Sequence, residues 1–232
     1  MKEKEKRKKG LGYYFWYLSL PVLLLIIWEG ADLAGAIKPY TMPSPGLIIE
    51  TAIALAKSGE LAANIWVSII LVLEGFFLAL VTAFLLGICI ALFPKVEAFT
   101  DLVLQIVRPI PPIAWIPLAI LWFGIGSSSK IFIIFLGAFF PILINTVDGI
   151  SGIDRRFFEL SDVYEVPKVN MILKIVIPGA FPSILTGIRL GLGNAWVCVV
   201  AAEMIGATSG VGYMLSNGRS LSRPDIVILG ML

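Results

Sequence analysis

Long apolar runs separated by short polar interludes dominate the chain. The longest runs cover residues 13–34, 64–93, 131–147 and a stretch that starts at Ala180 or Pro182 and continues to about Met204. Because a membrane-crossing helix needs about 20 apolar residues, these runs predict membrane-spanning α-helices. The apolar residues are continuous rather than alternating, which favours a helical bundle over a membrane β-barrel. A last apolar run, residues 226–232, is too short to span, and we expect that the sequence ends inside this helix.

Two segments interrupt this pattern. The turn sequence TMPSPG at 41–46 precedes an amphipathic segment, Gly46–Lys57, which is too short to span and which Ser44 or Pro45 can open. The stretch RPIPPIAWIPLAILWFGIG at 108–126 carries Pro109, Pro111, Pro112 and Pro117, so no uninterrupted helix can cover it. A broken segment at membrane depth survives where protein or a water-filled cavity satisfies its backbone. It therefore either forms a pathway wall or only shapes the packing, and 127–130 is expected to be an outer loop.

Polar residues recur at helical spacing just before the prolines. Glu97, Asp101, Gln105 and Arg108 fall at i, i+4, i+8 and i+11, which predicts one polar stripe on a helix. Arg108 either extends its charge to the lipid headgroups or contacts a substrate directly. Both interpretations remain open at this stage.

Composition identifies a membrane protein and its distribution of charge gives an orientation. Of 232 residues 58% are hydrophobic and 15% charged, and the mean hydropathy is +0.93. These values lie outside the range of soluble domains. The basic tail, residues 1–12, predicts a cytoplasmic N-terminus by the positive-inside rule, ahead of a single transmembrane domain of about six helices at 13–232. The fold class is therefore an all-α, multi-pass bundle in the cell membrane, surrounded by lipid.

The sequence gives little support for chemistry by the chain itself. Histidine is absent, which removes the commonest general base and the commonest zinc ligand, so we expect no catalytic residues and no metal site. Cys89 and Cys198 lie inside apolar runs and are expected to be buried free thiols. The net charge of +2 gives no indication of nucleic-acid binding, and we expect none.

The longest charged interlude, residues 157–182, begins with a helical pattern. Phe157, Leu160 or Ser161, and Tyr164 share one face of a helix at 157–166. The opposite face carries Glu159, Asp162 and Glu165, and Pro167 ends the helix. On periodicity alone this is either a docking helix at the membrane surface or an ordinary solvated loop helix.

The loop at 151–178 resembles the cytoplasmic loop of the membrane subunits of binding-protein-dependent ABC importers. Their signature is E-A-A-x3-G-x9-I-x-L-P, and Glu159, Ile175 and Pro178 stand in register with its Glu, Ile and Pro. The departures are Leu160 and Ser161 for the alanines, Glu165 for the glycine and Ile177 for the leucine. MPSP at 42–45, the proline-rich stretch and GIRLGLGNAWVCVVAAEMIGATSGVGYML at 187–215 are similar to the nitrate/sulfonate/taurine branch.

This resemblance implies a type I ABC importer permease fold with specific partners. These are cytoplasmic ATPase subunits, a second permease copy or paralogue, and an extracytoplasmic substrate-binding protein. The sequence contains no G-x4-G-K-[ST] phosphate loop, so ATP and Mg would be bound by the partner ATPase and not by this chain. The residues implied in ATPase coupling are Phe157, Glu159, Leu160, Ser161, Asp162, Tyr164, Glu165 and Pro178.

Several residues are candidates for a substrate pathway, and the substrate stays open. An anion such as a sulfonate, taurine or nitrate would suit Arg108 or Arg189, whereas an aromatic vitamin precursor would suit Trp115 or Trp196. The full candidate set is Arg108, Pro112, Trp115, Arg189, Asn194, Trp196 and Glu203. Gly187, Gly191 and Gly193 favour close helix packing. Two rival hypotheses are an ion-coupled secondary transporter using Glu74, Arg189 and Glu203, and a membrane anchor that transports nothing.

Overall fold

The computed structural model describes residues 11–35 and 42–232, with side chains from Tyr17 onwards in the first helix. Every regular element in these described residues is a helix, which confirms the all-α prediction. The structure does not describe the basic tail up to residue 10 or Lys38 and Pro39, which follow the first apolar run. It also does not describe the side chains of Tyr13, Tyr14 and Trp16.

The chain forms two compact units. One contains the described residues up to Leu61 together with Met214–Leu232, and the other is Ala62–Tyr213. The larger unit holds nearly all of α3 (Glu60–Leu92), then α4 (Pro94–Val107), η1 (Pro112–Trp115), α5 (Ile116–Phe123), α6 (Ser127–Ser151), α7 (Arg155–Val163), α8 (Lys168–Met171), η2 (Ile172–Val176), α9 (Ile177–Gly206) and the start of α10 (Val211–Ser220).

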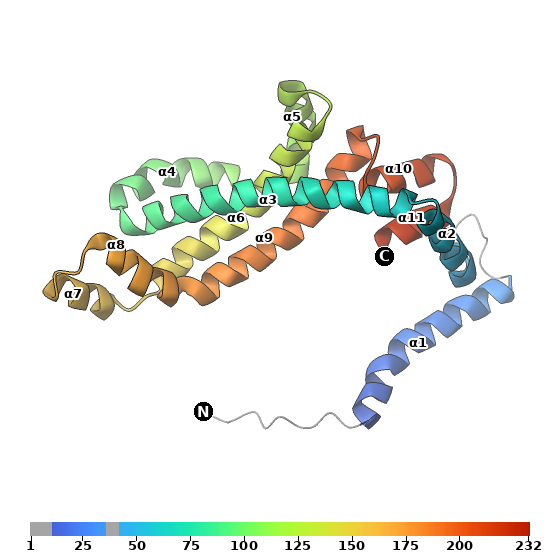
Figure 1. Ribbon diagram of the computed structural model, residues 1–232, viewed down its shortest axis with the longest axis horizontal. Coiled ribbons are helices and arrows are strands. Elements are labelled where there is room, and N and C mark those ends of the chain that lie inside the picture. The colour runs from blue at the N-terminus through green and yellow to red at the C-terminus, as the bar shows by residue number, and fades with distance from the viewer. Residues whose placement is uncertain (1–10, 36–41) are drawn as a thin grey trace. The chain divides into compact units, whose positions relative to one another are not determined.

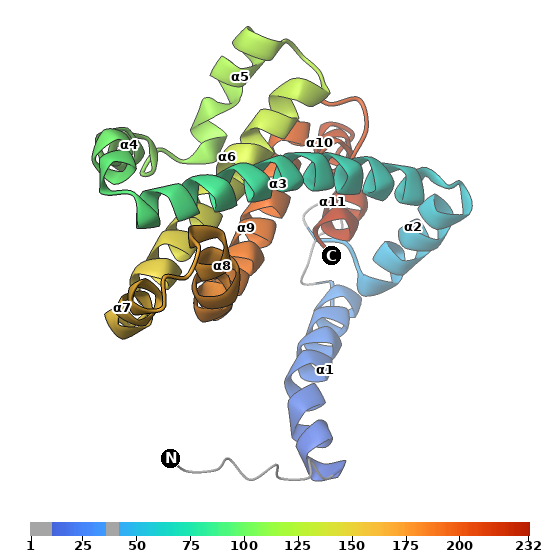
Figure 2. The ribbon, with the colours of Figure 1, turned by 60° about the vertical axis from the view of Figure 1, so that its left-hand side comes forward.

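Three helical segments of the described residues are long and apolar enough to cross a membrane. They are Glu60–Leu92, Ser127–Ser151 and Lys168–Gly206, the last running through α8, η2 and α9 without a break. A fourth crossing is possible through α4 and the η1–α5 segment, which are bent by 85° at the proline-rich stretch. The break predicted from the prolines is therefore confirmed, and Figure 2 shows α5 turned away from α4.

Helices α6 and α9 lie side by side along their length (Figures 1 and 2). Glycines bring them together, because a Cβ at Gly187 would stand 2.7 Å from the Asn145 Cβ and one at Gly137 would stand 2.5 Å from the Cys198 sulfur. The predicted packing role of Gly187 and Gly191 is thus confirmed, whereas Gly193 has open space around it. Cys89 and Cys198 are free thiols, as predicted, but Cys198 is buried and Cys89 only half-buried, so the predicted burial of Cys89 is wrong.

Two predicted boundaries are wrong. Residues 127–130 form the first turn of α6 and not a loop, since α5 ends at Gly124, where φ is +77°, and the Ser129 hydroxyl bonds the Gly126 carbonyl at 3.1 Å. The last full spanning helix begins at Lys168 rather than at Ala180 or Pro182. The helix widens to a π-turn at η2 and continues through Pro178.

The smaller unit contains α1 (Leu11–Leu33), α2 (Pro45–Lys57), the rest of α10 and α11 (Pro224–Met231). The predicted start of α2 is confirmed, because the Ser44 side chain accepts a hydrogen bond from the Leu47 amide at 3.3 Å. Helix α2 packs on α11, where the Thr51 hydroxyl donates to Asp225 at 2.7 Å. Residues 208–225 are rich in polar residues and glycine, and they contain the helix α10 between two short turns.

Candidate functional site

Helix α7 lies at the end of the larger unit where α6 ends and the α8–α9 segment begins (Figure 1). It was predicted at 157–166 and is found at Arg155–Val163. It begins two residues early because Asp154 is the N-cap and accepts a hydrogen bond from the Arg156 amide at 3.0 Å. The negative side chain also suits the positive end of the helix dipole.

The two faces of α7 differ from the predicted ones in one respect. Phe158 packs inward against the buried cluster around Ile150 and Val176, and Ser161 is only 3% exposed, with its hydroxyl bonded to the Phe158 carbonyl at 2.9 Å. Ser161 therefore belongs to the inward face and not to the face of Phe157. The small side chain of Ser161 suits its buried position, because this face of α7 packs against the cluster around Ile150 and Val176.

The outward face of α7 is apolar and has no partner within the described chain. Phe157 is 53% exposed, Leu160 51% and Tyr164 76%. The acidic residues Glu159 and Asp162 are also exposed. Aromatic and aliphatic side chains gathered on one exposed helix face are typical of a surface that another protein covers.

The C-terminus of α7 is closed by a Schellman motif. The Val166 amide bonds the Ser161 carbonyl at 2.9 Å and the Glu165 amide bonds the Asp162 carbonyl at 3.1 Å, which are the two hydrogen bonds of that motif. Glu165, the first residue of the motif beyond the helix cap, has φ of +49°. This is the left-handed position that glycine normally occupies, and the glycine of the loop signature falls on it.

Pro178 lies in the first turn of α9, directly after the π-turn at Ile172–Val176. Its ring has no N–H to donate to the preceding turn and would crowd it in an ordinary α-helix. The wider π-turn relieves that crowding, so α8, η2 and α9 run on as one helical segment, which the turn at 164–167 joins to α7. A displacement of α7 can therefore reach the spanning helix directly.

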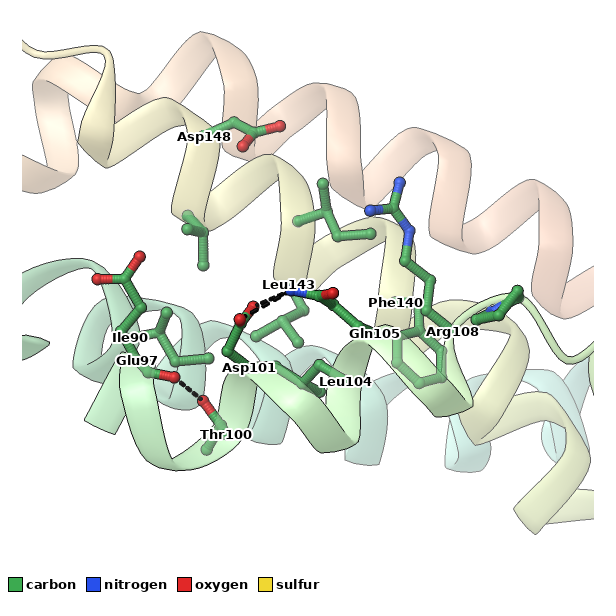
Figure 3. Close-up of a pocket in the computed structure, with 13 residues that line it drawn as sticks. Ile90, Glu97, Thr100, Asp101, Leu104, Gln105, Arg108, Phe140, Leu143 and Asp148 are labelled. Carbon is green, nitrogen blue, oxygen red and sulfur yellow. Dashed lines mark hydrogen bonds between the residues drawn. The ribbon is translucent and has the colours of Figure 1, made fainter. Parts of the chain in front are cut away.

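The polar stripe of α4 faces a cavity of about 610 Å³ between α4 and α6. Glu97, Asp101, Gln105 and Arg108 all line it, and Asp148 of α6 lines the opposite wall (Figure 3). The Gln105 amide bonds both Asp101 oxygens, at 2.8 and 2.7 Å. The predicted stripe is therefore confirmed.

The outer face of α4 is apolar, which is the reverse of a soluble surface helix. Phe99 is 84% exposed and Leu102 68%, while no residue of α4 is fully buried. An apolar outer face meets lipid or another apolar protein surface. The water-accessible side of α4 is then the inner side, where the cavity lies.

A second cavity, of about 370 Å³, adjoins the first at Arg108. It is lined by Arg108 and Pro112 from the broken segment, by Asn145 of α6 and by Asn194 of α9. Three of the predicted pathway residues, Arg108, Pro112 and Asn194, are thus brought together. The proline-rich stretch positions Arg108, since α4 ends at Val107 and the chain turns away through Pro109.

The other predicted pathway residues lie elsewhere. Trp115 packs on the core cluster, with its ring centroid 6.4 Å from that of Trp122. Arg189 and Trp196 are exposed on α9 and line neither of the two cavities. These three residues are not brought to Arg108.

Glu203 is buried near the C-terminal end of α9 and is 1% exposed. The Ser68 hydroxyl lies 2.7 and 2.8 Å from its two oxygens, and the Gly212 amide donates to it at 2.9 Å. Ser68 in turn accepts from the Val211 amide at 2.9 Å, and Asn64 accepts from the Gly210 amide at 2.8 Å. The carboxyl group thus helps to cap α10 and does not line the cavities at Arg108.

Sequence reasoning missed Asn64, Ser68 and Asn145. Asn64 and Ser68 are polar residues four apart on α3, so they share a face within an apolar run, and that spacing is the signal that could have found them. Asn145 lies four residues after Pro141, to whose carbonyl its amide donates at 2.8 Å.

Comparison with known proteins gives one family. Residues 75–231 match the family described as binding-protein-dependent transport system inner membrane component. The chain belongs to this family. The predicted resemblance is thereby confirmed, and this ABC transporter permease is a non-enzymatic transport component.

The permease is similar to several full-length relatives. It is 43% identical over 221 residues to a putative ABC transporter permease of Methanocaldococcus jannaschii, covering 93% of this chain and 82% of the relative. It is 39% identical over 232 residues to a putative aliphatic sulfonates transport permease of Bacillus subtilis, covering 99% and 84%. It is 34% identical over 218 residues to the taurine transport system permease of Escherichia coli, covering 92% and 79%.

Replacing Glu165 with glycine should stabilise the α7 loop of the permease by about 1 kcal/mol. The left-handed conformation costs a non-glycine residue about 1–2 kcal/mol, and the greater freedom of glycine in the unfolded chain returns part of this. The measurement is hydrogen exchange of the Val166 amide, which should slow about fivefold. Glu165→Ala is the control, because it removes the carboxylate and keeps the strain; equal slowing in both variants would contradict the explanation.

Proposed function

We propose that this permease imports a small oxyanion and that α7 is the helix through which a cytoplasmic ATPase drives it. Family membership makes it the membrane component of a binding-protein-dependent importer, with ATPase and binding-protein partners. The observation that carries the coupling proposal is the exposed apolar face of α7, formed by Phe157, Leu160 and Tyr164. We call these three side chains the coupling surface.

The connection from α7 to α9 supports the way force would be transmitted. Phe158 ties α7 to the cluster at the inner ends of α6 and α9, and α8, η2 and α9 form one uninterrupted helical segment. Movement of a docked ATPase would therefore displace α9 as a lever rather than bend a loose loop. ATP and Mg would be bound by that ATPase, and a second copy of the chain or a paralogue would complete the pathway.

The substrate class follows from the Arg108 cavities and from the relatives. Two of the relatives are named for aliphatic sulfonates and taurine, which both carry a sulfonate group. A guanidinium at a cavity is the side chain best suited to an oxyanion. The aromatic alternative has less support, because Trp115 packs against the core cluster and neither Trp115 nor Trp196 lines either cavity.

The rival hypothesis of an ion-coupled transporter has no such support. Its three residues do not form a relay: Glu74 lines a separate cavity with Lys130, Arg189 lies exposed on α9, and Glu203 is enclosed by Ser68 and Gly212. A membrane anchor would need no broken helix lining a cavity.

Truncating the coupling surface tests the coupling proposal. Phe157→Ala combined with Leu160→Ala should lower ATP-driven uptake at least about tenfold, because the docked ATPase would lose two large apolar contacts and a loss of about 1.4 kcal/mol of binding is already a factor of ten. Uptake and ATP hydrolysis are measured together in proteoliposomes that contain the ATPase and the binding protein. Phe99→Ala, which removes a phenylalanine of α4 that is even more exposed than Phe157, is the control. Coupled uptake that survives the double substitution would show that α7 does not transmit the force.

A further inference from the structure

We propose that Arg108, with Asn145 and Asn194, forms a transient binding site for the oxyanion in the 370 Å³ cavity, and that the carboxylates lining the adjoining cavity repel the anion and hold it at Arg108. This inference rests on the proposed substrate class. It goes further by assigning the site to three residues from three helical segments and by giving the two cavities opposite roles.

The charges that line the two cavities differ in sign. Arg108 is the one charged residue among those lining the smaller cavity, where Asn145 and Asn194 supply neutral amide groups. The larger cavity has Arg108 at its boundary, and the other charged residues that line it are Glu97, Asp101 and Asp148. An anion is therefore attracted on one side of Arg108 and repelled on the other.

Arg108 is available to a ligand. No salt bridge to it forms among the described residues, where the single pair within 4.0 Å joins Arg223 and Asp225. In Figure 3 the Arg108 side chain extends from the end of α4 towards α6 and away from Asp101, whose oxygens are engaged by Gln105. The guanidinium therefore has free donors at the junction of the cavities.

The size and the hydration of the site suit a small polar ligand. A cavity of about 370 Å³ is within the range of small-molecule sites. The outward apolar face of α4 means that its inner side, towards Arg108, is the wet one. A hydrated anion can therefore exchange water for guanidinium and amide donors there, which are groups that bind oxyanions in planar, directional pairs.

The acidic cavity limits where the anion can rest. The carboxylates of Glu97, Asp101 and Asp148 repel an anion, so the larger cavity is unfavourable for it. The anion is therefore held on the side of Arg108 where the two asparagines lie.

The rates at which charged thiol reagents label introduced cysteines measure the difference in electrostatic potential between the two cavities. This measurement does not depend on transport. In a full chain with Cys89 and Cys198 changed to alanine, and with its ATPase partner bound, Asn194→Cys reports on the smaller cavity and Gln105→Cys on the acidic one. The probes are anionic methanethiosulfonate ethylsulfonate and its cationic trimethylammonium counterpart. We expect the anionic-to-cationic rate ratio to be higher at Asn194→Cys than at Gln105→Cys, by about threefold to tenfold.

Adding Arg108→Gln should lower the ratio at Asn194→Cys by a similar factor, whereas Arg108→Lys should preserve it. Free ethanesulfonate should slow labelling of Asn194→Cys. Ser220→Cys, on α10 and outside both cavities, is the control, and Asn145→Cys replaces the first reporter if that variant does not fold. An unchanged ratio after Arg108→Gln, or an equal change at Ser220→Cys, would overturn the site.

Sulfonate uptake, measured in proteoliposomes that contain the ATPase and the binding protein, separates this inference from the proposed function. If the parent chain and its partners import no sulfonate, the proposed substrate class is wrong, whatever the cysteines report. If sulfonate import is normal and Arg108→Gln alters neither labelling nor uptake, the permease function stands and the assignment of the site to Arg108 is wrong.

Discussion

Gly212→Ala is expected to destabilise the permease by about 3 kcal/mol, the upper end of the cost of overpacking. A Cβ at this position would overlap the carbonyl oxygen of Val200 and would stand 2.7 Å from the Cβ of Glu203. Both atoms belong to α9, a long helix whose backbone cannot yield locally without losing its own hydrogen bonds. The start of α10 would therefore separate from α9, and its amides would lose their partners.

Thermal unfolding of the detergent-solubilised chain measures this loss, which corresponds to about 6–12 °C in Tm for a chain of this size. Gly193→Ala is the matched control. It is the same substitution inside α9, but a Cβ there meets nothing within 4 Å, so the better helix propensity of alanine should leave Tm equal or slightly higher. Equal losses of Tm in the two variants would contradict close packing at Gly212 as the cause.

Features encoded locally were predicted from the sequence. The α4 stripe follows from a spacing of four residues, and the break after it follows from prolines that cannot donate a hydrogen bond. The position of α7 was predicted within a few residues. Its glycine-like turn at Glu165 also has a local cause, but only the φ of +49° shows that the turn forms without the glycine.

Features that depend on other helices were not predicted. Periodicity could not decide whether Phe157 or Phe158 turns inward, because both are phenylalanines and the choice depends on the cluster at Ile150. The resemblance places Pro178 at the proline of the loop signature, but it does not reveal the π-turn before Pro178 that lets the helix continue. Glu203 looked like a pathway charge, because Ser68, its partner, lies 135 residues away in the chain.

Glu203→Ala is expected to lower the free energy of unfolding by about 3 kcal/mol. The substitution removes the acceptor of the Ser68 hydroxyl and of the Gly212 amide, both of which are buried. A buried donor left without a partner costs about 1–3 kcal/mol, and the space vacated by the side chain adds to that cost. The measurement is again the thermal unfolding of the detergent-solubilised chain.

Glu203→Gln separates a structural carboxyl group from one that carries ions. Glutamine has the same shape, and its amide oxygen can still accept from Gly212 while its nitrogen donates to the Ser68 oxygen, so most of the stability should remain. If Glu203 had to gain and release protons during transport, this substitution would abolish transport even in a stable protein. We therefore expect Glu203→Gln to keep both Tm and ATP-driven uptake near those of the parent. Stable protein with abolished uptake would instead return Glu203 to the pathway and revive the ion-coupled hypothesis.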